Sequence, residues 1–129
     1  MPSVDSIMSR EVLTISSDTP LAEAARRMSG GQVGAVVVMD DEKLVGILTE
    51  RDLMRAVGDA RVEGATVADW MTRDPETIDP SESTEMAATL MIHGGFRHLP
   101  VVESGNVVGV VSIRDLMRVV LDDAAPRGV

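Results

Sequence analysis

The chain contains two copies of one sequence pattern, aligned without a gap. Shifting the sequence by 63 positions places Met8 on Met71 and the segment 51–55 on 114–118, both of which read Arg-Asp-Leu-Met-Arg. An internal period of this kind fixes the architecture before single residues are weighed, because each copy must form a similar structural unit. Since only two copies are present, we expect a paired domain instead of an open solenoid.

The size, charge and composition of the chain exclude several classes of function. A lone copy of about 55 residues would form a core only marginally, so we expect the two halves of the 129-residue chain to fold together. The formal net charge of −9 removes the long-range attraction for nucleic acids and anionic membranes. The absence of cysteine excludes disulfides and thiolate chemistry. Because no apolar run is long enough for a membrane span or a signal peptide, we expect a cytoplasmic protein with neither a membrane nor a nucleic-acid partner.

Each copy predicts the element order β-α-β-β-α, which defines a mixed α+β fold. Apolar residues at helical spacing indicate the first helix of each copy, two glycines end it, and buried apolar runs indicate the paired strands. For the first copy we predict an extended entry at 13–15, a helix at 20–28, strands at 34–39 and 44–48, and a helix at 50–57. For the second copy the same elements are predicted at 76–78, 83–93, 98–102, 107–111 and 113–121.

The expected domain bounds follow from the repeat and from a polar connection between the copies. The first repeat is expected to cover 1–60 and the second 67–121, with a tail at 122–129. The stretch from about residue 58 to residue 66 is small, polar and aperiodic, which is typical of a linker. Neither the linker nor the tail carries a motif.

Each copy ends its second buried strand with the motif Gly-apolar-apolar-Thr/Ser-x-Arg-Asp, at 46–52 and 109–115. One interpretation is structural, because a Thr or Ser N-cap with an acid three positions later approximates a reciprocal capping box. The other is functional: N–H groups at a helix start bind a phosphate, a hydroxyl donates to it, and a carboxylate one turn later accepts both hydroxyls of a ribose. Arg51 and Arg114 are cationic candidates within the motif. Duplication does not decide between the two interpretations, because a repeated helix also repeats its cap.

Together these features resemble a tandem pair of cystathionine-β-synthase (CBS) domains over residues 4–121. The resemblance rests on the duplicated unit, the Met-Ser/Thr opening, the strand Arg-His-Leu-Pro-Val-Val at 97–102 and the twin Gly-x-x-Thr/Ser-x-x-Asp endings. It implies a Bateman module, in which two β-α-β-β-α repeats pack about a pseudo-twofold axis and leave two clefts. In that family the clefts take adenosine-containing ligands such as AMP, ADP, ATP or S-adenosylmethionine, with AMP our first expectation here.

The resemblance also implies roles for particular residues. Asp52 and Asp115 would bind ribose hydroxyls, and Thr49 and Ser112 would bind the phosphate. The entry segments would pack on the adenine and hydrogen-bond it through the main chain, with Thr14, Ile15, Thr77 and Ile78 as the residues concerned. Arg97 and His98 have no basic counterpart in the first copy, so we expect the two clefts to be unequal. Which cleft they serve, and whether His98 is a ligand or a plain strand residue, is left open.

Other residues are expected to serve the fold alone. Core filling is expected of four methionines: Met28, Met54, Met91 and Met117. Trp70 matches Ile7 in the first copy, which favours a packing role. His93 stands at a helix end and is expected to offset the helix dipole, and neither histidine has the partners of a metal site.

Three classes of function are compatible with the sequence. The first is a regulatory module that binds an adenosine-containing ligand and signals to an unknown protein in trans. The second is a nucleotide-free homodimeric scaffold in which the Thr/Ser-x-x-Asp motifs are only helix caps and the last helices supply the interface through Leu53, Met54, Leu116 and Met117. The third is an enzyme, which we do not expect, because no nucleophile motif and no metal-binding carboxylate cluster is present. We therefore assign no catalytic residue and no required cofactor.

Overall fold

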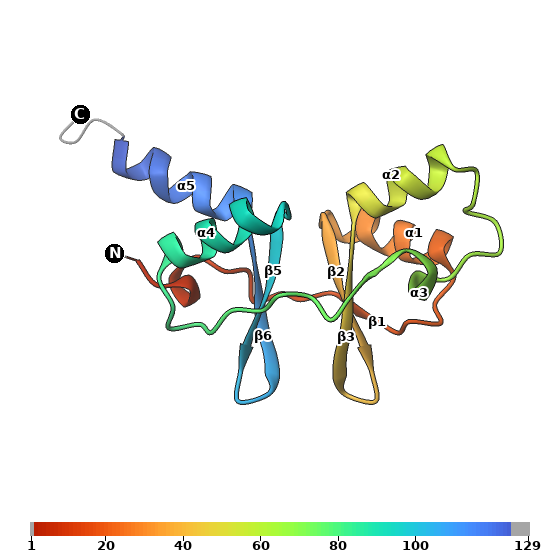
Figure 1. Cartoon of the computed structure of the whole chain (residues 1–129), viewed down its shortest axis with the longest axis horizontal. Coiled ribbons are helices and arrows are strands. Elements are labelled where there is room, and N and C mark those ends of the chain that lie inside the picture. Colours follow the sequence, from red (N-terminus) through yellow and green to blue (C-terminus); the bar gives the residue numbers. More distant parts are fainter. Residues whose placement is uncertain (1, 125–129) are drawn as a thin grey trace. The chain divides into compact units, whose positions relative to one another are not determined.

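The computed structural model describes residues 2–124 and divides into two compact units (Figure 1). One unit is Val12–Pro75, which we call the central unit. The other joins Met1–Glu11 to Glu76–Val129 and is called the terminal unit. Within residues 2–124, no helix is both long enough and apolar enough to cross a membrane.

The central unit is built on a four-stranded sheet in the order β1-β2-β3-β4. Its strands are β1 (Thr14–Ile15), β2 (Ala35–Asp40), β3 (Lys43–Thr49) and β4 (Thr72–Arg73). β1 runs parallel to β2, whereas the other neighbouring strands are antiparallel. Its helices are α1 (Leu21–Gly31), α2 (Glu50–Gly58) and α3 (Val67–Trp70). In Figure 1, α1 and α2 lie at the end of the β2–β3 hairpin that is opposite its turn.

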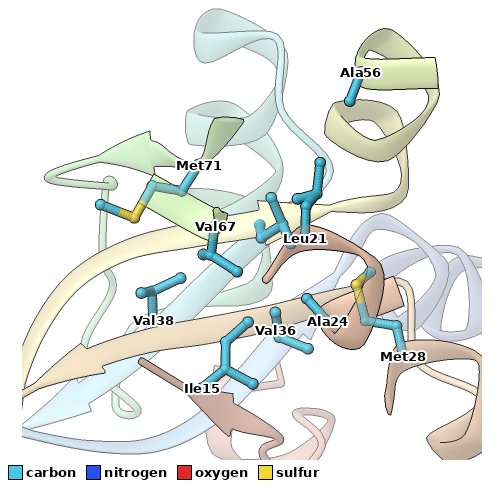
Figure 2. Packing of buried hydrophobic residues seen from close by; sticks show 10 residues of the cluster. Ile15, Leu21, Ala24, Met28, Val36, Val38, Ala56, Val67 and Met71 are labelled. Carbon is cyan, nitrogen blue, oxygen red and sulfur yellow. The ribbon is translucent and has the colours of Figure 1, made fainter. Parts of the chain in front are cut away.

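The core of the central unit follows from the spacing of its apolar residues. Leu21, Ala24 and Met28 recur at helical spacing and are the buried residues of α1. The middle of β2 is apolar and fully buried, as expected for a strand with neighbours on both sides. The core cluster comprises Ile15, Leu21, Ala24, Met28, Val36, Val38, Leu48, Ala56, Val67 and Met71, which Figure 2 draws as sticks and labels except for Leu48.

The terminal unit repeats this plan around a single hairpin. Its strands are β5 (His98–Glu103) and β6 (Asn106–Ser112), and its helices are η1 (Val4–Ser6), α4 (Thr84–Gly94) and α5 (Ile113–Ala124). Ile78 forms a parallel bridge with Val101, just as β1 runs parallel to β2. Its core cluster comprises Val4, Met8, Ile78, Ala87, Met91, Leu99, Val101, Val111 and Leu116. The predicted α+β fold with two repeated strand-helix units is therefore confirmed.

The opening segment of each copy does not pack with its own copy. It packs in the compact unit that contains most of the other copy. Val4 and Met8 belong to the core of the terminal unit, and Val67 and Met71 belong to that of the central unit. In Figure 2, Val67 and Met71 lie among residues of the first copy. The predicted bounds 1–60 and 67–121 describe repeats in the sequence and remain a prediction. They differ from the bounds of the compact units, because each unit contains residues from both repeats.

Two glycines make room for these opening segments. A Cβ on Gly46 would lie 2.6 Å from Met71 Sδ and 2.9 Å from the carbonyl oxygen of Thr72. A Cβ on Gly109 would lie 2.6 Å from Met8 Sδ and 2.8 Å from the Ser9 carbonyl oxygen. The glycine that begins each Gly-x-x-Thr/Ser-x-x-Asp ending is therefore required for close packing of the chain against β3 or β6.

Several details differ from the sequence predictions. The elements η1, α3 and β4 were not predicted, because each is only two to four residues long and needs its partner strand or core to form. α5 continues to Ala124, into the predicted tail, and residues 125–129 lie outside the described residues. Core positions for Met54 and Met117 are wrong, because they are 74% and 51% exposed on the outer faces of α2 and α5. Met28 and Met91 are buried as predicted.

Candidate functional site

The start of α2 is a complete capping box. Thr49 is the N-cap, and its backbone N–H and Oγ1 both donate to Asp52 Oδ2, at 2.9 and 3.1 Å. In return, the Asp52 backbone N–H donates to Thr49 Oγ1 at 3.4 Å. The carboxylate also suits the positive end of the helix dipole. The structural interpretation of the first motif is therefore present in the fold.

The start of α5 repeats the reciprocal bonds of the box. The Ser112 N–H donates to Asp115 Oδ2 at 2.8 Å, and the Asp115 N–H donates to Ser112 Oγ at 3.1 Å. One bond differs, because the Ser112 hydroxyl has no acceptor among residues 2–124, whereas the Thr49 hydroxyl donates to Asp52. The Ser112 hydroxyl hydrogen can therefore be donated to a ligand.

Few backbone donors remain at either helix start. The Glu50 N–H donates to the Gly34 carbonyl at 3.0 Å, and the Ile113 N–H donates to the Arg97 carbonyl at 2.8 Å. The Asp52 and Asp115 N–H groups are taken by the cap hydroxyls. The expectation of free N–H groups is therefore wrong for these four amides, which leaves few main-chain donors for a phosphate at either helix start.

An arginine that the sequence analysis did not single out lies beside each carboxylate. Arg55 Nη1 is 3.5 Å from Asp52 Oδ1, and Arg118 Nη1 is 3.8 Å from Asp115 Oδ1. The Asp52 and Asp115 side chains are 6% and 15% exposed. The signal was available, because Asp and Arg stand three residues apart in both copies of Arg-Asp-Leu-Met-Arg, a spacing that brings helical side chains together. The predicted cations Arg51 and Arg114 are exposed in the same helical turns.

Arg55 has a second partner from the opening of the second copy. Its Cζ lies 5.9 Å from the centroid of the Trp70 ring, within the range of a cation–π contact. Trp70 is partly buried against the core of the central unit, which confirms its predicted packing role. The matching position in the terminal unit is Ile7, which has no aromatic face.

The entry segments are built into the sheets and cores. The side chains of Ile15 and Ile78 belong to the core clusters, while Thr14 and Thr77 are exposed. The Ile78 N–H donates to Pro100 at 3.1 Å, and its carbonyl accepts from Val102 at 2.9 Å. Because sheet pairing uses both main-chain groups of Ile78, an adenine contact in the terminal unit would fall to Thr77.

The entry strand and the cap share a sheet but do not meet. Thr14 pairs with Val37 and Thr49 pairs with Ala35, so β2 lies between them. Thr14 and Thr49 are thus two strand spacings apart across the sheet and two residues apart along the strands, which corresponds to roughly 12 Å between their Cα atoms. A ligand that contacts both Thr14 and the cap at Thr49 therefore has to span the width of β2.

Arg97 and His98 lie beside the second motif. His98 is the first residue of β5 and pairs with Ser112, so their Cα atoms are about 5 Å apart. Arg97 precedes it, and its carbonyl accepts from the first amide of α5. The terminal unit therefore brings Arg97 and His98 together with Ser112, whereas Gly34 and Ala35 hold the matching places in the central unit.

Both copies match a known family. The family model of the CBS domain matches residues 4–59 and again residues 67–122. The chain belongs to the CBS-domain family. The CBS match covers each copy of the repeat separately, so the resemblance inferred from the motifs is confirmed.

Solved CBS structures have the same fold. A protein with CBS domains from Burkholderia ambifaria MC40-6 is 30% identical, with a TM-score of 0.90 over 99% of this chain and 100% of that one. The CBS domain pair of MJ0100, solved with 5′-methylthioadenosine and S-adenosyl-L-methionine, is 27% identical, with a TM-score of 0.89 over 95% of this chain and 98% of that one. CBSX2, solved with AMP, is 25% identical, with a TM-score of 0.82 over 97% of this chain and 100% of that one.

Proposed function

We propose that this CBS protein is a cytoplasmic regulatory module that binds an adenosine-containing ligand and signals to a protein partner in trans. The observation that carries the proposal is the duplicated carboxylate at the starts of α2 and α5, ordered by a capping box in each unit. A carboxylate that is already fixed loses little conformational entropy when a ligand binds. Its proposed role is regulatory and not catalytic.

The ligands of the solved relatives support the assignment of these carboxylates. 5′-methylthioadenosine and S-adenosylmethionine, bound by the MJ0100 pair, share adenine and ribose with the AMP bound by CBSX2. Of the three, only AMP has a phosphate. A site that recognises the shared part needs acceptors for the ribose diol more than it needs donors for a phosphate. In this proposal, Asp52 and Asp115 supply these acceptors.

Side chains near the second motif support AMP as the first candidate. In this proposal the Ser112 hydroxyl, Arg97 and His98 meet the phosphate, because they adjoin the start of α5, where backbone donors are already used. Thr49, Arg51 and Arg114 have the corresponding roles at the two helix starts. The main chains of Thr14 and Thr77 contact the adenine, and Ile15 and Ile78 support them from the cores.

Calorimetric titration with AMP, with S-adenosylmethionine and ATP as competitors, tests the proposal. Asp52→Asn and Asp115→Asn together are expected to weaken binding strongly while the fold is retained, because the one oxygen of each amide is used by the cap N–H and its nitrogen cannot accept from the diol. Asp69→Asn is the matched control, since Asp69 forms a capping box with Thr66 in α3 outside the proposed site. Undiminished binding by the double variant would contradict the assignment.

A second candidate is the nucleotide-free homodimeric scaffold. It is favoured by the apolar side chains exposed on α2 and α5, which are Met54, Val57, Met117, Val120 and Leu121. The capping boxes also need no ligand to form. Sedimentation would find a dimer for either candidate, but only the scaffold predicts a dimer that gives no heat with any adenosine-containing ligand. A monomer at tens of micromolar would remove the homodimer from both.

A further inference from the structure

The two carboxylates differ in how many hydrogen bonds they already accept. A carboxylate offers about four lone-pair positions. Counting donors among residues 2–124, Asp52 accepts three bonds, from the Thr49 N–H, Thr49 Oγ1 and Arg55 Nη1. By the same count, Asp115 accepts one, from the Ser112 N–H, and Arg118 approaches its other oxygen only to 3.8 Å. A vicinal diol donates two hydrogen bonds, so Asp115 has room for it and Asp52 does not.

Arg55 is the bond donor at Asp52 that can move. Thr49 is fixed in the backbone of the cap, whereas the Arg55 side chain is 64% exposed. If Arg55 left, Asp52 Oδ1 would be open for both hydroxyls. The contacts that keep Arg55 in place therefore determine whether a ribose diol can reach the Asp52 carboxylate.

The contact that keeps Arg55 in place is with the Trp70 ring. The guanidinium lies over a ring that is itself packed on the core of the central unit, so the ring is a fixed platform. Arg118 has no such platform, because Ile7 stands where Trp70 would be. The difference between the two arginines follows from one substitution between the copies.

We propose that Arg55, held over Trp70, is a built-in competitor for the Asp52 carboxylate. A ribose diol then binds first at Asp115 and reaches Asp52 only when Arg55 swings away. This inference rests on the proposed function and adds a ranking of the two carboxylates and a positioning residue, Trp70, that acts through Arg55. Since Trp70 is the only tryptophan, it also reports the displacement.

The test uses 5′-methylthioadenosine, an uncharged diol, so that loss of an arginine does not change attraction for a phosphate. In an Asp115→Asn background only Asp52 remains, and calorimetry measures its affinity. Each contact of an exposed arginine changes an equilibrium constant by at most about fivefold. Arg55→Ala removes both contacts and is expected to tighten binding about three- to tenfold, whereas Trp70→Ile removes only the ring contact and is expected to tighten it about two- to fivefold. Arg55→Lys keeps the charge without the planar stack and is expected to lie between wild type and Arg55→Ala.

The matched control is Arg118→Ala in an Asp52→Asn background, which is expected to change affinity less than twofold, because Arg118 has no stacking partner. Trp70 fluorescence is the second readout. Ligand added to the Asp115→Asn protein should alter the emission as Arg55→Ala does without ligand, and ligand should have no further effect once Arg55 is absent. Thermal denaturation checks that each variant is folded.

Two failures can be told apart. If wild type binds the ligand through Asp115 but Arg55→Ala leaves the Asp52 affinity unchanged or weaker, the competitor role is wrong and the proposed function stands. If 5′-methylthioadenosine, AMP and S-adenosylmethionine bind neither wild type nor any variant, the proposed function itself is overturned, and this inference falls with it.

Discussion

At the level of single residues, the Gly-x-x-Thr/Ser-x-x-Asp motif has two roles. Its glycine allows close packing, and its aspartate belongs to the candidate site. Gly46 and Gly109 make room for the opening segment of the other copy, and Asp52 and Asp115, six residues later, lie in the first turn of the following helix. The glycine is constrained by contact with a backbone carbonyl, which cannot move aside as a flexible side chain would. The two ends of the motif are therefore expected to respond differently to substitution.

Gly46→Ala tests the constraint at the glycine. The added Cβ would meet both Met71 Sδ and the Thr72 carbonyl, so we expect a loss of about 1–3 kcal/mol in the free energy of unfolding. Gly58→Ala is the control, because nothing lies within 4 Å of a Cβ at that position. Urea denaturation measures both, and equal stability of the two variants would show that the close approach carries no cost.

At the scale of elements, the hairpins of the two copies turn in the same way but with different residues at the second turn position. Asp41 and Glu42 connect β2 to β3 with φ of 49° and 63°, and Ser104 and Gly105 connect β5 to β6 with φ of 51° and 81°. Two successive positive φ values are typical of a type I′ turn, which favours glycine at its second position. The second copy has that glycine, whereas the first holds a side chain in a left-handed conformation.

Glu42→Gly should relieve this strain. Removing a side chain from the left-handed region, less the added backbone entropy of glycine, is expected to raise the free energy of unfolding by about 0.5–1 kcal/mol. The converse change, Gly105→Glu, should lower it by a similar amount. Thermal and urea denaturation of both variants provide the measurement, and a loss of stability in Glu42→Gly would contradict the strain argument.

At the scale of the whole molecule, each compact unit combines residues from both copies. Val4 and Val67 occupy matching positions in the repeat, yet each is fully buried in the unit that holds most of the other copy. Neither copy can therefore complete its core from its own contiguous sequence. This exchange couples the folding of the two copies, in agreement with the marginal core expected for about 55 residues.

Val4→Ala tests which unit depends on the exchanged segment for its stability. Deleting buried methyl groups is expected to cost about 2 kcal/mol, and amide hydrogen exchange should accelerate in residues 84–122 more than in residues 12–59. Val67→Ala should show the opposite pattern. If each copy formed its own core, Val4→Ala would instead destabilise residues 12–59, an outcome that would refute the exchange.

The repeated β-α-β-β-α order, the family and the capping residues could all be predicted from the sequence, because they depend on local spacing and on the period of 63 positions between matching residues such as Met8 and Met71. The sequence did not determine that Met8 lies on Gly109 and Met71 on Gly46, since an offset between copies is the same whether the opening segments are exchanged or not. The position of Arg55 over Trp70, and the smaller number of open lone pairs on Asp52 than on Asp115, became visible only in the folded chain. Arg55 and Trp70 belong to different elements, so packing geometry and not local propensity brings them together. The bonds at Asp52 and Asp115 join residues only three positions apart, but how far Arg55 and Arg118 lie from these carboxylates depends on what packs beside each arginine.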